Sequence, residues 1–143
     1  MNDFDPLNPE AYCFWAPEHV RFADLDMLGH VNNKAYATYF ESGRIAYFSK
    51  CGINDGPKVG MVMVRLEIDY RKEITFPATL RVGVRPLKMT RSTLTLGCAI
   101  FNGAVCAANS VSTAIRFDPV ARRSTPFSET ERAMIEADLS MEA

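Results

Sequence analysis

One long helical segment, followed by four strand-like segments with short connections, limits this chain to few folds. Residues 33–50 carry aromatic or small side chains at intervals of three and four, the spacing that lines one face of a helix. Asn32 or Asn33 can cap its start, and Gly52 can adopt the left-handed conformation that often ends a helix. The residues on the repeated face are Tyr36, Phe40, Gly43 and Tyr47.

Gly43 lies inside this helix, where glycine is unfavourable by up to about 1 kcal/mol relative to alanine. We expect close packing of a sheet or a second helix against Gly43 to compensate. Glu41 and Arg44 stand three positions apart, so we expect them to form a structural ion pair on the helix surface.

The segment after the helix alternates as a half-buried strand does, over about residues 61–70. One predicted face carries Val62, Val64, Leu66, Ile68 and Tyr70, and the other carries Met61, Met63, Arg65, Glu67 and Asp69. Pro77-Ala78 then turns the chain into a second strand, in which Leu80, Val82 and Val84 alternate with Arg81, Gly83 and Arg85.

Asn102-Gly103 predicts a two-residue hairpin turn, because a type I′ turn needs positive φ at both central positions. It joins a third strand, about 92–101, to a fourth, 104–117, and pairs Phe101 with Ala104. This register places Cys98 and Cys106 on opposite faces, which excludes a disulfide between them. The shared apolar face is predicted to carry Leu94, Leu96, Cys98 and Ile100 with Val111, Asn109, Ala107 and Val105.

A short helix closes the chain after Asp118-Pro119 ends the fourth strand. Ser128 and Glu131 form a capping-box pattern that starts this helix, which runs to about Leu139. The predicted fold class is therefore α+β, with one antiparallel sheet wrapped around one long helix. We expect residues 1–143 to form a single domain, with residues 1–10 flexible. A homo-oligomer would cover the remaining sheet face or edge.

Composition excludes several classes of protein. The 143 residues include 16 basic and 17 acidic side chains, so the basic excess of a nucleic-acid-binding protein is missing. No apolar run approaches the roughly 20 residues of a membrane-spanning helix, and the acidic start lacks an apolar signal core, so we expect a cytoplasmic protein that does not enter the membrane. Four scattered cysteines and two histidines predict free thiols and no structural metal.

A polar cluster immediately precedes the long helix. It includes Asp24, Asp26, His30, Asn32 and Asn33. The first amides of a helix are unpaired and can polarise a carbonyl oxygen or stabilise an oxyanion. A carboxylate beside such amides is a minimal site for acyl transfer. The alternative is that these residues only cap the helix and hold the loop, as the same residue types often do.

The motif D-x-x-G-H-V-N-N, followed by A-Y-x-x-Y-F-E-x-x-R, resembles the hotdog-fold 4-hydroxybenzoyl-CoA thioesterase family, and most of all its bacterial acyl-CoA thioesterase branch. The resemblance covers about residues 16–127 and implies a hotdog fold and thioester hydrolysis. It implies Asp26 as nucleophile or general base and the Asn33 backbone N–H as the group that polarises the carbonyl. Asp24 is the second candidate acid. His30 is a further catalytic candidate and Asn32 a substrate-binding candidate, and both are expected to shape the loop.

The resemblance also implies how the substrate is held. Coenzyme A is expected as part of the substrate, with no metal and no redox cofactor, and the site is expected between the protomers of a homodimer or homotetramer. The turn between the second and third strands would meet the nucleotide end of coenzyme A, although a solvated charged turn is the alternative. Its candidate phosphate ligands are Arg85, Lys88, Arg91 and Ser92. Candidates for the acyl pocket are Tyr36, Tyr39, Phe40, Met61 and Met63.

Two other functions stay open at this point. An enoyl-CoA hydratase of the same fold would use an acid and a histidine together, and Asp26 and His30 lie four positions apart. A non-catalytic acyl-CoA-binding protein would bind coenzyme A without turnover. The serine nucleophile elbow G-x-S-x-G does not occur in the sequence.

Overall fold

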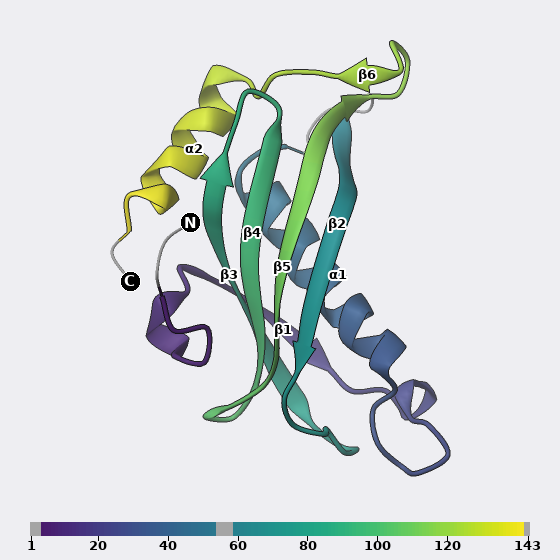
Figure 1. The fold of residues 1–143 in the computed structure, drawn as a ribbon. Helices are drawn as coiled ribbons and strands as arrows, with labels where there is room; N and C mark the ends of the chain where they lie inside the picture. The colour runs from purple at the N-terminus through teal and green to yellow at the C-terminus, as the bar shows by residue number, and fades with distance from the viewer. Residues whose placement is uncertain (1–3, 54–58, 142–143) are drawn as a thin grey trace.

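A curled antiparallel sheet wraps around one central helix in the computed structural model, which describes residues 4–53 and 59–141. The strand order is β1-β3-β4-β5-β2, and a short β6 pairs with β5 (Figure 1). The strands are β1 (Phe14–His19), β2 (Gly60–Tyr70), β3 (Thr79–Met89), β4 (Thr93–Asn102), β5 (Val105–Asp118) and β6 (Arg123–Ser124), and the helices are α1 (Asn33–Lys50) and α2 (Glu129–Leu139). This is the predicted α+β hotdog architecture.

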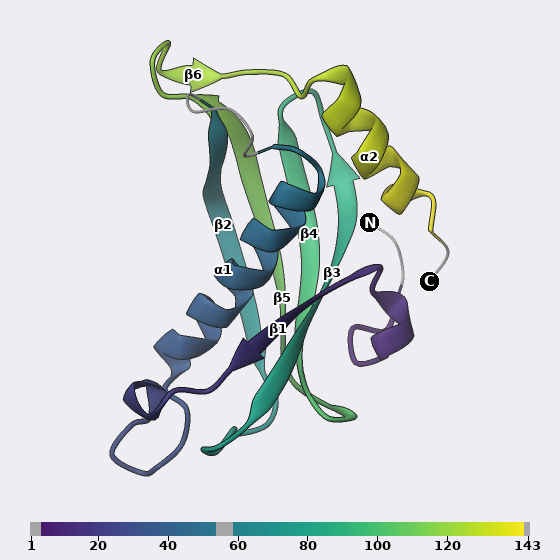
Figure 2. The ribbon, with the colours of Figure 1, turned by 180° about the vertical axis from the view of Figure 1, so that it is seen from behind.

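Helix α1 lies across one face of the sheet and forms the main core with it (Figure 2). The predicted caps are present: the Asn32 side chain accepts from the Lys34 amide, and Gly52 takes a φ of 79°. At the other end of the chain, Ser128 and Glu131 form the reciprocal capping box of α2. Local sequence signals therefore define both helices.

Gly43 is the point of closest approach between α1 and the sheet. A Cβ atom at this position would lie 2.5 Å from Val82 Cγ1 and 3.2 Å from Val82 Cβ. Val82 is fully buried in β3. The close packing expected from the helical glycine is thus confirmed, and it brings α1 onto β3.

The strict alternation predicted for β2 is wrong. A bulge between Met63 and Arg65 adds one residue, so the side chains on either side of it change parity. Residues that pair directly on neighbouring strands point to the same face of the sheet. The residues of β2 that face α1 are therefore those that pair with the residues of β5 that face α1. These residues are Met63, Leu66, Ile68 and Tyr70, with Met61 one step further along the strand. Val62 and Val64 are exposed instead.

The predicted register of the β4–β5 hairpin is also wrong. Asn102 pairs with Val105, so the turn lies at Gly103-Ala104 rather than at Asn102-Gly103. A further irregularity between Ile100 and Phe101 shifts the rest of the ladder by one more residue. The face of β5 that meets the helix therefore carries Ala108, Ser110, Ser112 and Ala114, opposite Ile100, Cys98, Leu96 and Leu94. The four cysteines are free, as predicted.

The opposite face of the sheet carries a second, smaller core near the chain ends. Residues 1–10 were expected to be flexible. Residues 1–3 lie outside the described residues, but the segment from residue 4 packs there: the Tyr12 hydroxyl donates to the Pro6 carbonyl, and Phe4 contacts Tyr12 edge to face. Arg85 lies beneath them and donates to the carbonyls of Ala11 and Met141. Its guanidinium therefore joins the two ends of the chain, which lie close together in Figure 1.

Neither described helix is long and apolar enough to cross a membrane.

Candidate functional site

The loop before α1 is organised around Asp26. Its Oδ1 accepts from the amides of Leu28 (2.9 Å) and His30 (3.2 Å), and its own amide donates to the His30 carbonyl (2.8 Å). Gly29 allows this tight loop because it takes a φ of 81°. Asp26 itself is exposed. One carboxylate oxygen thus fixes the loop, and no described residue donates a hydrogen bond to Oδ2.

The amides at the start of α1 differ in what they bind. The Lys34 amide donates to the Asn32 side chain, and the Ala35 amide donates to the Asn32 carbonyl (2.8 Å). The Asn33 amide has no acceptor among the described residues, as expected for the first amide of a helix. An exposed acid and an unpaired helix amide therefore belong to the same short segment. Asn32 acts as the cap, which agrees with its predicted role in shaping the loop.

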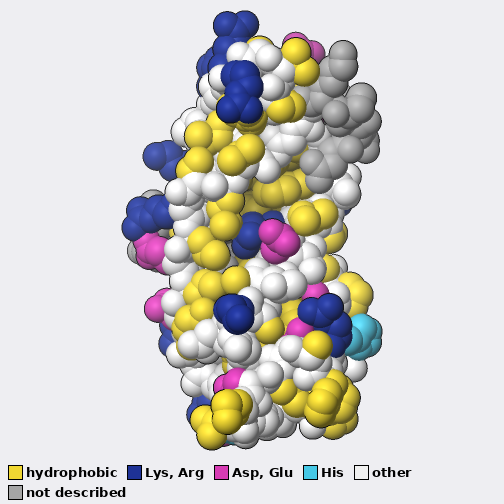
Figure 3. Space-filling model, turned by 90° about the vertical axis from the view of Figure 1, so that its right-hand side faces the viewer, with side chains coloured by type: hydrophobic (Ala, Val, Ile, Leu, Met, Phe, Trp, Pro, Cys, Tyr) yellow, Lys and Arg dark blue, Asp and Glu magenta, His cyan; other side chains and the backbone are white. Residues whose placement is uncertain are grey.

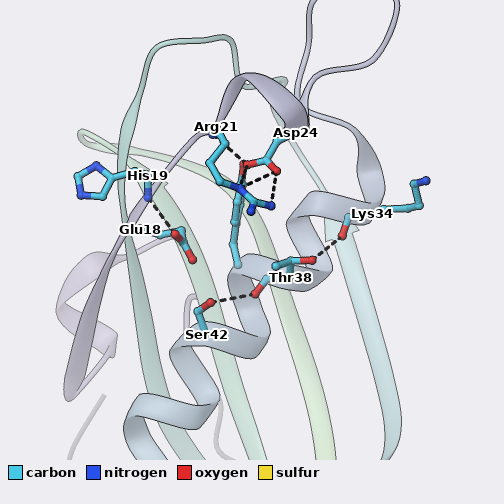
Figure 4. A network of polar contacts seen from close by, with 8 residues as sticks. Glu18, His19, Arg21, Asp24, Lys34, Thr38 and Ser42 are labelled. Carbon is cyan, nitrogen blue, oxygen red and sulfur yellow. Dashed lines mark hydrogen bonds and ion pairs between the residues drawn. The ribbon is translucent and has the colours of Figure 1, made fainter.

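Asp24, the second candidate acid, is buried and fully engaged. Figure 4 shows its carboxylate facing Arg21 above the start of α1. Its Oδ1 lies 2.8 Å from Arg21 Nη2, and its Oδ2 accepts from the Tyr39 hydroxyl at 2.6 Å. Burial raises the pKa of Asp24, but the hydrogen bonds from Arg21 and Tyr39 outweigh burial and hold that pKa below its usual value. Asp24 is therefore a structural anion.

His30 does not form an acid–imidazole pair with Asp26. Its ring Nε2 lies 3.1 Å from Glu73, and its backbone pairs with Thr75. The contact between His30 and Asp26 is made by backbone groups of His30. His30 thus ties the loop to the segment that follows β2, and this arrangement gives no support to hydratase chemistry.

A cavity of about 350 Å³ opens between α1 and the edge strand β2. The predicted pocket residues Met61 and Met63 line it, whereas Tyr36, Tyr39 and Phe40 are buried core residues outside it. The complete lining is Glu41, Arg44, Ile45, Phe48, Gly60, Met61, Met63 and Ala114. Figure 3 shows this side of the molecule as a broken apolar band in which a basic and an acidic group meet.

The expected ion pair between Glu41 and Arg44 is not formed. No described carboxylate lies within 4.0 Å of the Arg44 guanidinium, and Arg44 Nη1 is buried without a hydrogen-bond partner in the described part of the chain. Arg44 is only 5% exposed. Burial lowers the pKa of Arg44, and the nearby Cys98 and Glu41 act in the opposite direction.

Of the predicted phosphate ligands, Arg85 lies away from the others in the structure. Arg85 is 1% exposed and bound to backbone carbonyls, so it does not share a surface with the charged turn. Lys88 and Arg91 are exposed, and Ser92 lies beside them with its carbonyl accepting from Arg116.

Sequence reasoning left Arg123 out of this region. Arg91 and Arg123 line one cavity of about 510 Å³, together with Asp118, Ser124, Thr125 and Pro126. Arg123 reaches this cavity because the chain turns after Asp118-Pro119 and β6 pairs back onto β5. That Asp118-Pro119 turn was the sequence signal that could have predicted it. Among the described residues, no group of three or more His, Cys, Asp or Glu side chains is placed to hold a metal.

Comparisons with known proteins agree with the fold. A family model described as "Thioesterase-like superfamily" matches residues 20–135. A thioesterase from Thermus thermophilus, crystallised with coenzyme A and zinc, is 30% identical and superposes with a TM-score of 0.81 over 94% of this chain and 99% of its own. The PA5185 protein of Pseudomonas aeruginosa, 23% identical, shares the fold with a TM-score of 0.84 over 91% of this chain and 94% of its own.

One curated relative is also similar in sequence. The uncharacterized protein YsmA of Bacillus subtilis is 34% identical over 87 residues, which cover 60% of this chain. The match spans 59% of the length of that relative.

Proposed function

Because the chain belongs to the thioesterase-like superfamily, whose model it matches over residues 20–135, we propose that it hydrolyses an acyl-CoA thioester to a free carboxylic acid and coenzyme A. The observation that carries the proposal is that an exposed carboxylate, Asp26, and an unpaired amide, Asn33 at the start of α1, belong to the same ordered loop. A thioester is activated relative to an oxygen ester, so a carboxylate suffices without a catalytic triad.

The chemistry begins at the thioester carbonyl. The Asn33 N–H donates to the carbonyl oxygen and stabilises the negative charge that develops there, helped by the positive end of the helix dipole. Asp26 Oδ2 is the free oxygen, because Oδ1 is held by the amides of Leu28 and His30. These two bonds keep the carboxylate oriented while Oδ2 reacts.

Two routes follow from the same arrangement. In the nucleophilic route, Oδ2 attacks the carbonyl carbon, the carbon–sulfur bond breaks, coenzyme A leaves as the thiolate, and water then hydrolyses the mixed anhydride. In the general-base route, Oδ2 takes a proton from the water whose oxygen attacks the carbonyl carbon, the carbon–sulfur bond breaks, and coenzyme A leaves as the thiolate, to which the proton on Asp26 is then passed. The enzyme returns to its starting state in both routes.

The nucleotide end of coenzyme A is assigned to the charged turn between β3 and β4. Arg91 and Ser92 come from that turn, Lys88 lies at the end of β3 beside it, and Arg123 faces the same cavity as Arg91. Arginine suits phosphate because its planar fork donates two parallel hydrogen bonds. The similar Thermus thermophilus thioesterase crystallised with coenzyme A supports a ligand of this class.

The acyl group is assigned to the apolar surface between α1 and β2, where Met61 and Met63 lie. The same edge strand exposes Val62 and Val64, which are 49% and 56% accessible. An exposed apolar edge strand favours pairing with another chain. A homodimer or homotetramer, with the site completed at the protomer interface, is therefore part of the proposal.

The test replaces one carboxylate at a time and follows free-thiol release from acyl-CoAs. Asp26→Asn keeps an oxygen for the two loop amides but removes the reactive charge, so kcat should fall at least about 100-fold, or about 2.7 kcal/mol, while the melting temperature stays nearly unchanged. Asp24→Asn is the matched control, which should lower stability and leave the folded fraction active. Full activity in the Asp26 variant would remove this residue from the mechanism.

The same assay separates the alternatives. A hydratase would add water to an enoyl-CoA without releasing thiol, and a binding protein would take up coenzyme A in a fixed ratio with no turnover of any acyl chain.

A further inference from the structure

Arg44 is a buried cation that forms no ion pair within 4.0 Å in the described chain. Its side chain is 5% exposed, it lines the cavity between α1 and β2, and its Nη1 has no hydrogen-bond partner in the described part of the protein. Burying a charge without a partner is strongly unfavourable, and buried charges in proteins are normally paired. An anion that enters the cavity would supply the missing partner.

The neighbours of Arg44 attract its charge but do not pair with it: Glu41 acts on the Arg44 guanidinium from beyond 4.0 Å. Cys98 lies close by on β4, but burial raises the pKa of its thiol to about 12, so it is neutral at physiological pH. Glu41 lines the same cavity, but its side chain is exposed and forms no ion pair with Arg44 within 4.0 Å. The remaining cavity walls are apolar or are backbone, from Ile45, Phe48, Gly60, Met61, Met63 and Ala114.

A row of apolar side chains on β2, which we call the apolar track, runs from this cavity toward the proposed reaction centre. The Tyr70 hydroxyl donates to the Asn33 carbonyl, so the end of β2 lies beside the start of α1. From there, the side chains of β2 that face α1 lead back to Met63 and Met61 in the cavity wall. The bulge between Met63 and Arg65 makes this track continuous, because it puts residues on both sides of it onto one face.

The distance along α1 identifies the anion. Arg44 follows Asn33 by eleven residues, which corresponds to about 16 Å at about 1.5 Å per residue. The carboxylate released at the Asn33 amide therefore cannot bind Arg44 at the same time. Arginine side chains on a helix lean toward its N-terminus, so the guanidinium lies somewhat nearer to Asn33 than its own Cα.

We propose that the cavity around Arg44 binds a second carboxylate at the far end of the acyl chain, so that the substrates are thioesters of long-chain dicarboxylic acids with coenzyme A. This inference rests on the proposed hydrolysis. A carbon–carbon bond of about 1.5 Å advances an extended chain by about 1.25 Å, so roughly ten to twelve carbons span the distance. Arg44 then acts as the specificity group for the chain end, through a charge-assisted pair in an apolar pocket.

The experiment compares two thioesters that differ only at the far end of the chain. The mono-thioester of dodecanedioic acid with coenzyme A ends in a carboxylate, and its methyl ester carries no charge there. For the wild type, kcat/KM should be at least about 10-fold higher for the carboxylate, a difference of about 1.4 kcal/mol. Arg44→Met should remove this preference or reverse it, mainly through KM on the carboxylate substrate.

Three variants make the result specific. Arg44→Met should fold with unchanged or higher stability, because it removes an unpaired buried charge and replaces the aliphatic part of the arginine side chain with an unbranched apolar one. Arg44→Lys should retain part of the preference, since it keeps the charge and loses the bidentate fork. Glu41→Gln should increase the preference, because it removes a carboxylate that repels the chain end in the same cavity.

Several outcomes would overturn the inference while leaving the proposed function intact. One is equal hydrolysis of both thioesters by the wild type, and another is an equal loss of kcat/KM on both thioesters in Arg44→Met. A fall in the stability or the oligomeric mass of Arg44→Met would also overturn it, because it would give Arg44 a partner within the protein. If no thioester is hydrolysed, the proposed hydrolysis fails, and calorimetry then tests whether Arg44 binds the terminal carboxylate. Dodecanedioate should bind the wild type about 10-fold more tightly than dodecanoate and lose that advantage in Arg44→Met; equal binding refutes it.

Discussion

Replacing Gly43 by alanine tests the contact that positions α1 on the sheet. Alanine is favoured over glycine in a helix interior by about 1 kcal/mol, so the substitution would stabilise an isolated helix. In this protein the new Cβ would lie 2.5 Å from Val82 Cγ1, well inside the roughly 3.5–4.0 Å of a normal carbon–carbon contact. Val82 is fully buried in β3 and cannot turn aside freely.

The two effects have opposite signs, and packing should dominate. Overpacking a core is unfavourable by about 1–3 kcal/mol. An approach of 2.5 Å to a buried valine belongs in the upper part of that range, about 2–3 kcal/mol, which exceeds the gain of about 1 kcal/mol in helix propensity. We expect Gly43→Ala to lower the free energy of unfolding by about 1–2 kcal/mol. For a chain of 143 residues, an unfolding entropy of about 2.1 cal/mol/K per residue converts this loss to a melting temperature lower by about 3–7 °C.

A double-mutant cycle gives the decisive measurement. Val82→Ala removes the atom that the new Cβ would meet, so Gly43→Ala should be neutral or stabilising in that background, with a coupling of about 1–2 kcal/mol. Urea unfolding of the four proteins measures this coupling. The reasoning is refuted if Gly43→Ala stabilises the wild type, or if the two changes add without coupling.

Two further predictions concern the buried acid and the phosphate site. Asp24→Asn should reduce the free energy of unfolding by about 1.5–3 kcal/mol at pH 7. Because the hydrogen bonds from Arg21 and Tyr39 outweigh burial and keep the folded pKa of Asp24 low, this stabilisation is complete above about pH 4 and is lost as the pH falls through the folded pKa. Urea unfolding at acid pH in which the wild type keeps its full stability advantage over the variant would contradict the prediction. The double variant Arg91→Ala with Arg123→Ala should raise KM for an acyl-CoA about 10-fold with little change in kcat. An acyl-pantetheine lacks the nucleotide phosphates and should show no such rise in KM. An equal rise for both substrates would place the phosphates elsewhere.

Features that depend on neighbours in the chain were predictable. The caps of α1 and α2 depend on Asn32 and Ser128 and on amides within three residues of them, so both helices begin where the sequence predicts. The loop motif around Asp26 and Asn33 is equally local. Its acid and helix amide were identified from spacing and resemblance, and their catalytic roles stay a prediction for the activity assay.

Features that depend on distant partners were not predictable. Arg85 resembles a phosphate ligand in the sequence, yet it holds Ala11 and Met141, which lie 74 and 56 residues away. Arg123 joins Arg91 only because β6 folds back onto β5. Residue type predicts that an arginine will bind an anion or a carbonyl, but only its surroundings decide which of them is present.

By itself the sequence determined the order of the two helices and the four long strands, the α+β class and the residues of the loop before α1, because these follow from contacts within a few positions. The tertiary structure alone decided which faces of β2 and β5 meet α1. Each strand contains an irregularity, one between Met63 and Arg65 of β2 and one in the β4–β5 ladder, and a shift of one residue turns every later side chain to the other face. Such a shift is set by pairing and packing across the sheet, so strict alternation along the chain could not reveal it.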